Sequence, residues 1–234
     1  MTALNSMTRS KRGTASTSDT VAVSLSRAIH EHRLVPGTKL GEDELAEIYG
    51  VSRTIIRTAL QSLAHTQLVE IHRNRGAFVA QPTPDEAREV FEARELLEPR
   101  TARMAARVAV AEDIALLRQH LAEEHAALAA DDRGRALYLS GQLHVRIAGI
   151  ANQMTIAGFV ETLIARSSLI VALYWKRESA LCERHAHHTL VDAIEAHDAD
   201  GAEALMRSHL VDLHSALDLR QVPASGASLR DILG

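Results

Sequence analysis

Apolar positions along the chain follow two different patterns, which meet near residue 81. Before that point, three short segments carry apolar residues three and four positions apart, the spacing of one face of a helix. Two short runs of strand-type composition follow them, joined by a turn. In order, these segments are 21–32, 42–49, 52–64 and the hairpin "LVEIHRNRGAFVA". Three helices followed by a hairpin predict a winged helix-turn-helix.

The second pattern is helical almost throughout, with few Gly or Pro residues before the last turns of the chain. Apolar residues recur at three- and four-residue spacing in six segments joined by short loops, which predicts an antiparallel bundle. The segments lie near 84–108, 111–130, 132–150, 153–175, 180–197 and 199–218. The expected fold class is therefore mainly α, with an N-terminal winged helix-turn-helix followed by an all-helical antiparallel bundle.

The boundary between the two patterns is the stretch "QPTPDEA". Thr83 suits a helix N-cap, Pro84 suits the first helical position, and Thr83 with Glu86 has capping-box spacing. The polar, Ser- and Thr-rich residues before the first helix predict a disordered tail. The expected organisation is a tail at 1–20, a winged helix at 21–80, a linker at 81–84, a helical domain at 85–220 and a C-terminal tail at 221–234.

Composition narrows the choice of partners. The longest apolar run, "LIVALYW", is far shorter than the roughly 20 residues that span a bilayer, so no membrane partner is expected. The single cysteine, Cys182, permits no internal disulfide, and a cytoplasmic location is expected. Although the net charge is -4, residues 1–81 carry ten Lys or Arg against seven Asp or Glu. A nucleic-acid partner would therefore meet the N-terminal part.

The segment "GVSRTIIRTAL" raises the question of why a helix with a buried face carries two arginines near its start. On a helix capped by Ser52, the apolar side chains share one face and a row of donors and hydroxyls shares the other. The outward residues are Arg53, Thr54, Arg57, Thr58 and Gln61. Such a face fits a DNA major groove, where Arg reads guanine and Ser or Thr bonds phosphate. The alternative is an ordinary solvated polar surface.

The hairpin adds Arg73, Arg75 and Gly76 at its tip, and here the sequence resembles a known family. "PGTKLGEDELAEIYGVSRTIIRTALQSLAHTQLVEIHRNRGAFVA" is similar to the DNA-binding domain of the GntR family of bacterial transcription regulators. The resemblance implies that double-stranded DNA is bound by Ser52, Arg53, Thr54, Arg57, Thr58, Arg73, Arg75 and Gly76. Two positions depart from the family pattern: Asp43 replaces a frequent basic phosphate contact, and Gln67 replaces a common turn glycine.

The text "VFEARELLEP" resembles the FCD effector-binding domain of the FadR-like branch of that family. Many such domains hold a divalent metal between an Asp, a His four residues later, and two further histidines. By local context the three histidines are His144, His187 and His209, and imidazole suits Zn or Ni. Ser140 stands where the Asp is expected. Three ordinary polar histidines with no metal are the alternative.

The resemblance also places Arg94 and Ser140 at the effector site, where a guanidinium would bind a carboxylate. Arg94 could equally form a surface ion pair with Glu98, four residues further along the helix. Low aromatic content, 3% of residues, disfavours a large planar ligand and leaves a small acid as the expected effector.

The function implied is that of a regulator rather than an enzyme. The helical domain would bind the effector and form a homodimer, and the dimer would place two winged helices on a palindromic operator. The alternatives are a metal-dependent hydrolase, using the histidines to activate water, and a metal-binding protein without catalysis. The hydrolase is disfavoured because the sequence has no HExxH motif.

Overall fold

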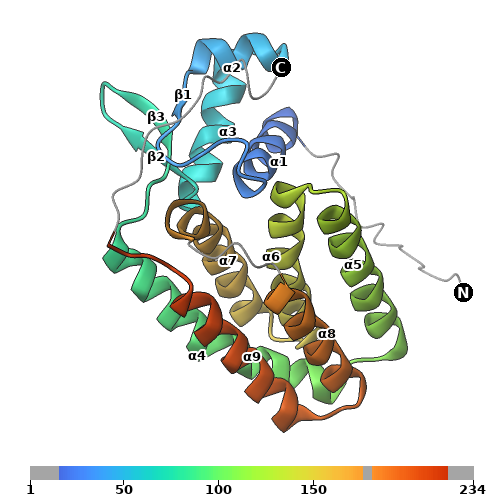
Figure 1. Ribbon diagram of the computed structural model, residues 1–234. Coiled ribbons are helices and arrows are strands. Elements are labelled where there is room, and N and C mark those ends of the chain that lie inside the picture. The colour runs from blue at the N-terminus through green and yellow to red at the C-terminus, as the bar shows by residue number, and fades with distance from the viewer. Residues whose placement is uncertain (1–15, 176–180, 221–234) are drawn as a thin grey trace, which may run out of the picture.

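The computed structural model describes residues 16–175 and 181–220, with the side chains of 181–184 excepted. It has two parts stacked one above the other, a small mixed α/β unit and a larger bundle of helices (Figure 1). This arrangement confirms the predicted fold class. The tail segments 1–15 and 221–234 lie outside the described residues.

The small unit is a winged helix-turn-helix. Its elements are α1 (Thr17–His30), β1 (Lys39–Leu40), α2 (Glu42–Tyr49), α3 (Arg53–His65), β2 (Val69–His72) and β3 (Gly76–Val79). Strand β3 lies between the other two and is antiparallel to both. The sequence predicted the β2–β3 hairpin but not β1, because a two-residue strand is too short to show a periodic pattern.

The first helix begins earlier than expected. Residues 17–20, predicted to belong to the tail, form the first turn of α1. Ser16 accepts a hydrogen bond from the Asp19 amide, and the Asp19 carboxylate accepts one from the Ser16 amide, so both ends of a capping box are present. This cap explains why the helix extends into a polar stretch that has no apolar face.

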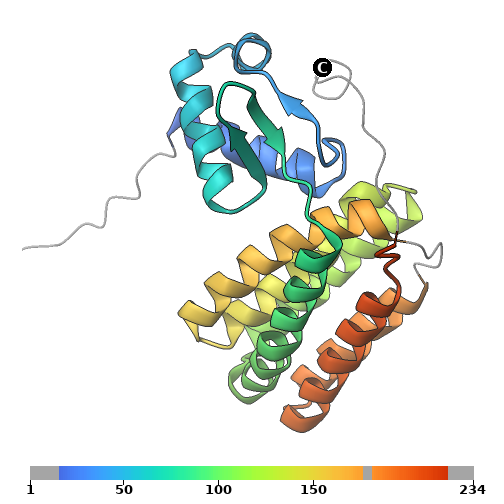
Figure 2. The same ribbon diagram turned by 90° about the vertical axis from the view of Figure 1, so that its left-hand side faces the viewer.

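The larger unit is the predicted helical bundle, within the described residues. Its helices are α4 (Pro84–Val108), α5 (Ala111–Ala129), α6 (Arg133–Ile150), α7 (Met154–Tyr174), α8 (Leu181–Glu195) and α9 (Ala199–Ser215). Helix α4 begins at the capping box of Thr83 and Glu86, as predicted. Figure 2 shows α4, α7 and α9 running alongside one another, with the winged helix above them.

Helix α7 is central to the molecule. It is the one described helix that is long and apolar enough to cross a membrane by length and composition. Here it packs against α4 and α6 in the bundle. Two of its residues, Ala165 and Leu169, also join the hydrophobic core of the winged helix. The helix therefore belongs to both cores, which accounts for its apolar composition.

Candidate functional site

The exposed face of α3 is built by the packing of its opposite face. Ile56, Ala59, Leu60 and Leu63 are buried in the core of the winged helix. Arg53, Thr54, Arg57 and Thr58 are exposed as a consequence, and the Ser52 hydroxyl accepts a hydrogen bond from the Ile55 amide at 3.4 Å, as expected for an N-cap. The turn before α3 uses Gly50, whose φ of 62° lies in the left-handed region that favours glycine.

The hairpin places its predicted residues at the tip. Arg73, Arg75 and Gly76 are all exposed, and the Arg75 guanidinium lies 5.7 Å from the centre of the Phe78 ring. Gln67, at the turn where a glycine is common, has a φ of 58° and so adopts the left-handed conformation without being glycine. The hairpin still begins at Val69, so this departure does not displace the wing.

Both arginines of α3 are paired with acids of α2. Arg57 donates to the Glu42 carboxylate at 2.7 and 3.2 Å, and Arg53 lies 3.0 Å from Asp43. Hydrogen bonding to Arg57 lowers the pKa of Glu42. Since both guanidiniums are more than half exposed, these pairs contribute little to stability. Sequence reasoning missed this pairing because it compares neighbours along one helix only.

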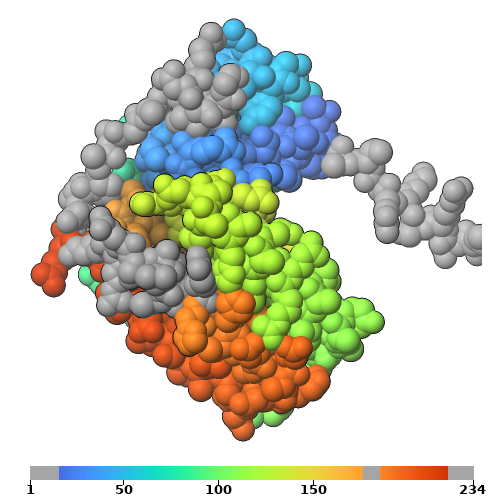
Figure 3. Space-filling model, turned by 45° about the vertical axis from the view of Figure 1, so that its right-hand side comes forward, coloured from blue at the N-terminus to red at the C-terminus, as the bar shows by residue number. Residues whose placement is uncertain are grey.

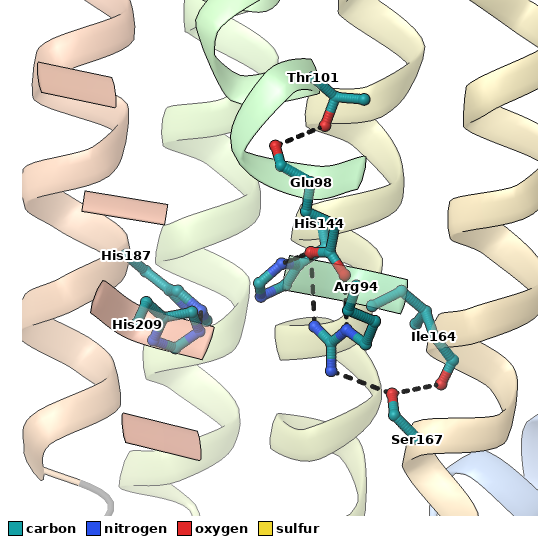
Figure 4. A network of polar contacts seen from close by, with 8 residues as sticks. All are labelled: Arg94, Glu98, Thr101, His144, Ile164, Ser167, His187 and His209. Carbon is teal, nitrogen blue, oxygen red and sulfur yellow. Dashed lines mark hydrogen bonds and ion pairs between the residues drawn. The ribbon is translucent and has the colours of Figure 1, made fainter. Parts of the chain in front are cut away.

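The three predicted histidines converge in the core of the bundle. His144 comes from α6, His187 from α8 and His209 from α9, and all three are buried. One ring nitrogen from each lies within 4.8 Å of the others. Figure 4 shows His187 and His209 side by side, with His144 facing them across a short gap. The structure thus brings together residues separated by 22 to 65 positions in the sequence.

Two buried carboxylates contact the Nδ1 atoms of two of these rings. Glu98 lies 2.5 Å from Nδ1 of His144, and both Glu124 oxygens lie 3.2 Å from Nδ1 of His187. When a neutral ring donates its Nδ1–H outward, its Nε2 keeps a lone pair that can bind a metal. The Nε2 atoms of His187 and His209 are 3.3 Å apart. Two nitrogen ligands of tetrahedral Zn are separated by about the same distance, given Zn–N bonds of roughly 2.0–2.1 Å.

The protonation states are consistent with metal binding. Burial lowers the pKa of His144, despite the opposing effect of Glu98, and burial lowers the pKa of His209 well below its usual value. Both rings are therefore neutral at pH 7, the form that coordinates metals. Burial would raise the pKa of Glu98, but Arg94 and His144 more than offset this and lower it to about 2. The donor set therefore fits a divalent metal such as Zn or Ni.

Arg94 is deeply buried rather than on a helix surface. Its side chain is 4% exposed, and its guanidinium donates to Glu98 at 2.5 and 3.4 Å and to the Ser167 hydroxyl at 3.1 Å. The ion pair predicted as the alternative role is therefore present, but it lies inside the bundle (Figure 4). Arg94 also lines a pocket. Its role toward an effector stays a prediction.

The pocket beside the histidines has a cavity volume of about 50 Å³. Ser140, Arg94 and His144 line it, so the predicted effector residues share one cavity with one of the predicted metal ligands. Sequence reasoning missed Ser167 and Glu124. Glu124 left a signal, because it lies on the buried face of α5 with Leu117 and Leu121, where a charged residue is unusual.

Comparison with known proteins gives the family of each part. Residues 17–79 match the profile described as bacterial regulatory proteins of the gntR family, and residues 89–212 match the FCD domain. The galactonate operon transcriptional repressor of Escherichia coli is 29% identical over 215 residues, covering 81% of this chain and 92% of that protein. The Uxu operon transcriptional regulator of Escherichia coli is 30% identical over 203 residues, covering 78% and 79%.

Solved structures agree on the fold. A regulator described as a putative GntR protein from Rhodococcus sp. RHA1 has a TM-score of 0.74 at 22% identity, covering 85% of this chain and 95% of that one. Escherichia coli McbR/YncC has a TM-score of 0.77 at 20% identity, covering 86% and 97%. At these identities the likeness concerns the fold alone.

Proposed function

This chain belongs to the GntR family of bacterial transcription regulators, and from that premise we propose that it is a cytoplasmic, ligand-responsive regulator that binds a palindromic operator as a homodimer. GntR regulators are non-enzymatic DNA-binding transcription factors, so the histidine cluster is not a hydrolase centre. The regulatory class and the FCD domain follow from the family. The operator, the dimer, the effector and the metal are the proposed parts.

The exposed face of α3 supports the DNA proposal most strongly. Its arginines and threonines stand on a helix whose other face is fixed in the core, so the donors are presented as one rigid row. We propose that Arg53 and Arg57 leave Asp43 and Glu42 and contact base edges in the major groove, while Ser52, Thr54 and Thr58 contact phosphates. Arg73, Arg75 and Gly76 would meet the backbone or minor groove.

The two-fold symmetry that is common among homo-oligomers supports the proposal that the chain forms a dimer and binds a palindromic operator. Most soluble homo-oligomers are closed dimers with a two-fold axis, and helix-turn-helix dimers bind half-sites about one helical turn apart. In this arrangement the helical domains pair and hold two copies of α3 on one DNA face. An effector changes DNA affinity only if it binds one arrangement of these domains better than the other.

The pocket supports an acidic effector. Glu98 and Ser167 engage three N–H donors of Arg94, and a guanidinium carries five, so donors remain for a ligand carboxylate. A divalent metal on His144, His187 and His209 would supply a second positive centre for the same acid, because Ser140 contributes no carboxylate to the metal. The relative named for the galactonate operon makes a sugar acid a reasonable first candidate for testing.

The DNA proposal is tested by selecting bound fragments from a sheared genomic library with the purified full chain. We expect enrichment of a small set of fragments that share an inverted repeat, together with loss of enrichment in the Arg53→Ala/Arg57→Ala double variant. A library recovered without any shared sequence, or recovered equally well by the double variant, would contradict specific recognition by α3.

A further inference from the structure

The pocket beside the histidines is not enclosed by the helical domain alone. Arg94, Ser140 and Ser167 line it from the bundle, but His30 and His32 line it from the end of α1 in the winged helix. Any molecule that fills this space therefore lies between the two domains. The effector residues proposed from the family resemblance, Arg94 and Ser140, belong to α4 and α6 of the helical domain, and none belongs to α1.

The end of α1 is held against the bundle by hydrogen bonds between side chains and backbone carbonyl oxygens. Nε2 of His32 lies 3.0 Å from the Ser168 carbonyl oxygen on α7, and the Ser168 hydroxyl donates to the His30 carbonyl at 3.5 Å. His32 adopts a φ of 55°, an uncommon conformation for a residue other than glycine, which turns the chain toward α7. The two domains thus touch at the edge of the pocket.

A glycine on α6 allows this close approach. A Cβ atom placed on Gly134 would lie 2.2 Å from the Glu31 carbonyl oxygen, a backbone atom that cannot swing aside. Only glycine fits at this position while α1 keeps its place. Figure 3 shows the start of α6, in yellow-green, directly beneath the blue residues of the winged helix.

The lining has a definite chemistry. Four residues that carry hydroxyl groups, Tyr138, Ser140, Ser167 and Ser168, line the space together with Arg94. His30 uses Nδ1 to contact the Ser26 carbonyl at 2.7 Å, so Nε2 of the neutral ring remains an acceptor for a ligand hydroxyl. A small acid that carries several hydroxyl groups satisfies both kinds of lining.

We propose that this pocket is a composite site in which a small hydroxylated acid contacts both domains of one chain, with its carboxylate at Arg94 and its hydroxyls reaching His30 and His32. The proposal rests on the regulatory function proposed above and adds a direct route from ligand to DNA-binding domain. A ligand that contacts α1 as well as the bundle stabilises the arrangement in which α1 lies against the bundle. By thermodynamic linkage, a change that weakens this contact between the domains lowers the affinity for the ligand by the same factor.

The test compares two glycine variants of the same helix. Gly134→Ala pushes α1 away from α6, whereas Gly149→Ala makes the same change where nothing lies within 4 Å. Calorimetry with lactate, tartrate and galactonate as probes should find at least one that binds the wild type. For that probe we expect Gly134→Ala to weaken binding by about tenfold or more and Gly149→Ala to change it less than about twofold.

A second pair of variants tests the same contact in case Gly134→Ala does not fold. His32→Asn keeps a residue that tolerates positive φ but shortens the side chain that reaches α7. His65→Asn is its control, at the exposed end of α3. Hydrogen exchange should show the amides of Arg33 and Leu34, which bond to Ala28, becoming more protected when the probe binds.

If a probe binds wild type, Gly134→Ala and His32→Asn with equal affinity, the composite site is wrong, while an effector pocket within the helical domain stands. If none of the acids binds the wild type, the composite site for hydroxylated acids is overturned, and DNA selection still decides the regulatory function.

Discussion

Glu124 offers a sharp test of the metal site. In this chain the expected Asp beside His144 is Ser140, so the three histidines bring no negative charge to a divalent ion. Glu98 is already neutralised by Arg94 at 2.5 Å. Glu124, whose side chain is 3% exposed, therefore carries the remaining buried negative charge next to the cluster, within the part of the chain that the structure describes.

Replacing Glu124 by Gln keeps the size of the side chain and removes its charge. Loss of a carboxylate partner behind a metal-binding histidine typically lowers metal affinity 10- to 100-fold, which is about 1.4–2.8 kcal/mol. We expect this loss for Zn and Ni in Glu124→Gln. The double variant Glu124→Gln/Ser140→Asp places a negative charge directly at the metal and should recover most of the metal affinity. If Glu124→Gln acted only by disturbing the packing of the bundle, a carboxylate at position 140 would not restore the affinity.

The assay is calorimetric titration of metal-stripped protein with Zn and Ni, with circular dichroism to confirm folding. Glu123→Gln is the matched control, because that side chain contacts Gln119 at the surface and not the histidines. Its affinity should match the wild type. Equal affinities in Glu124→Gln and Glu123→Gln would refute the idea that Glu124 compensates for Ser140.

Ser140→Asp alone should bind Zn more tightly than wild type in the same titration, and unchanged affinity would place the metal away from Ser140. Removal of the wing arginines in Arg73→Ala/Arg75→Ala should weaken binding to many DNA sequences and reduce the salt slope by about 1 for each phosphate that is no longer neutralised, measured by anisotropy at several salt concentrations. Asp43→Asn should tighten DNA binding by about two- to tenfold, because it removes the Arg53 partner and a charge that repels phosphate; weaker binding would show that the pair pre-orients Arg53 for DNA.

Local sequence patterns were sufficient for most of the fold. Helix α2 has the predicted bounds, and α4 runs from Pro84 to Val108 as expected, because a capping box and helical periodicity are both local signals. The start of α1 was placed late because the cap at Ser16 precedes any apolar residue of the helix. Strand β1 was missed because only its pairing with β3 defines it.

The sequence was sufficient to predict the three histidines of the candidate metal site, but not the residues that surround them. The resemblance to FCD domains indicated His144, His187 and His209, and the structure brings them together. The hydrogen bonds of Glu124 with His187 and of His32 with Ser168 join segments 63 and 136 residues apart, and no local pattern reports such pairings. Gly134 gave no signal either, since its role depends on the backbone of another domain.

Specific recognition of DNA through α3 is the property on which the proposed regulatory function depends. The most direct measurement is the affinity of the full chain for its selected fragment and for a scrambled duplex, by fluorescence anisotropy at fixed salt. Arg53→Ala/Arg57→Ala should lose about 1–3 kcal/mol per base contact on the selected fragment and much less on the scrambled one. Arg133→Ala/Arg207→Ala, which removes two exposed arginines of the bundle, should bind like wild type. Unchanged discrimination between the two duplexes in Arg53→Ala/Arg57→Ala would contradict the claim.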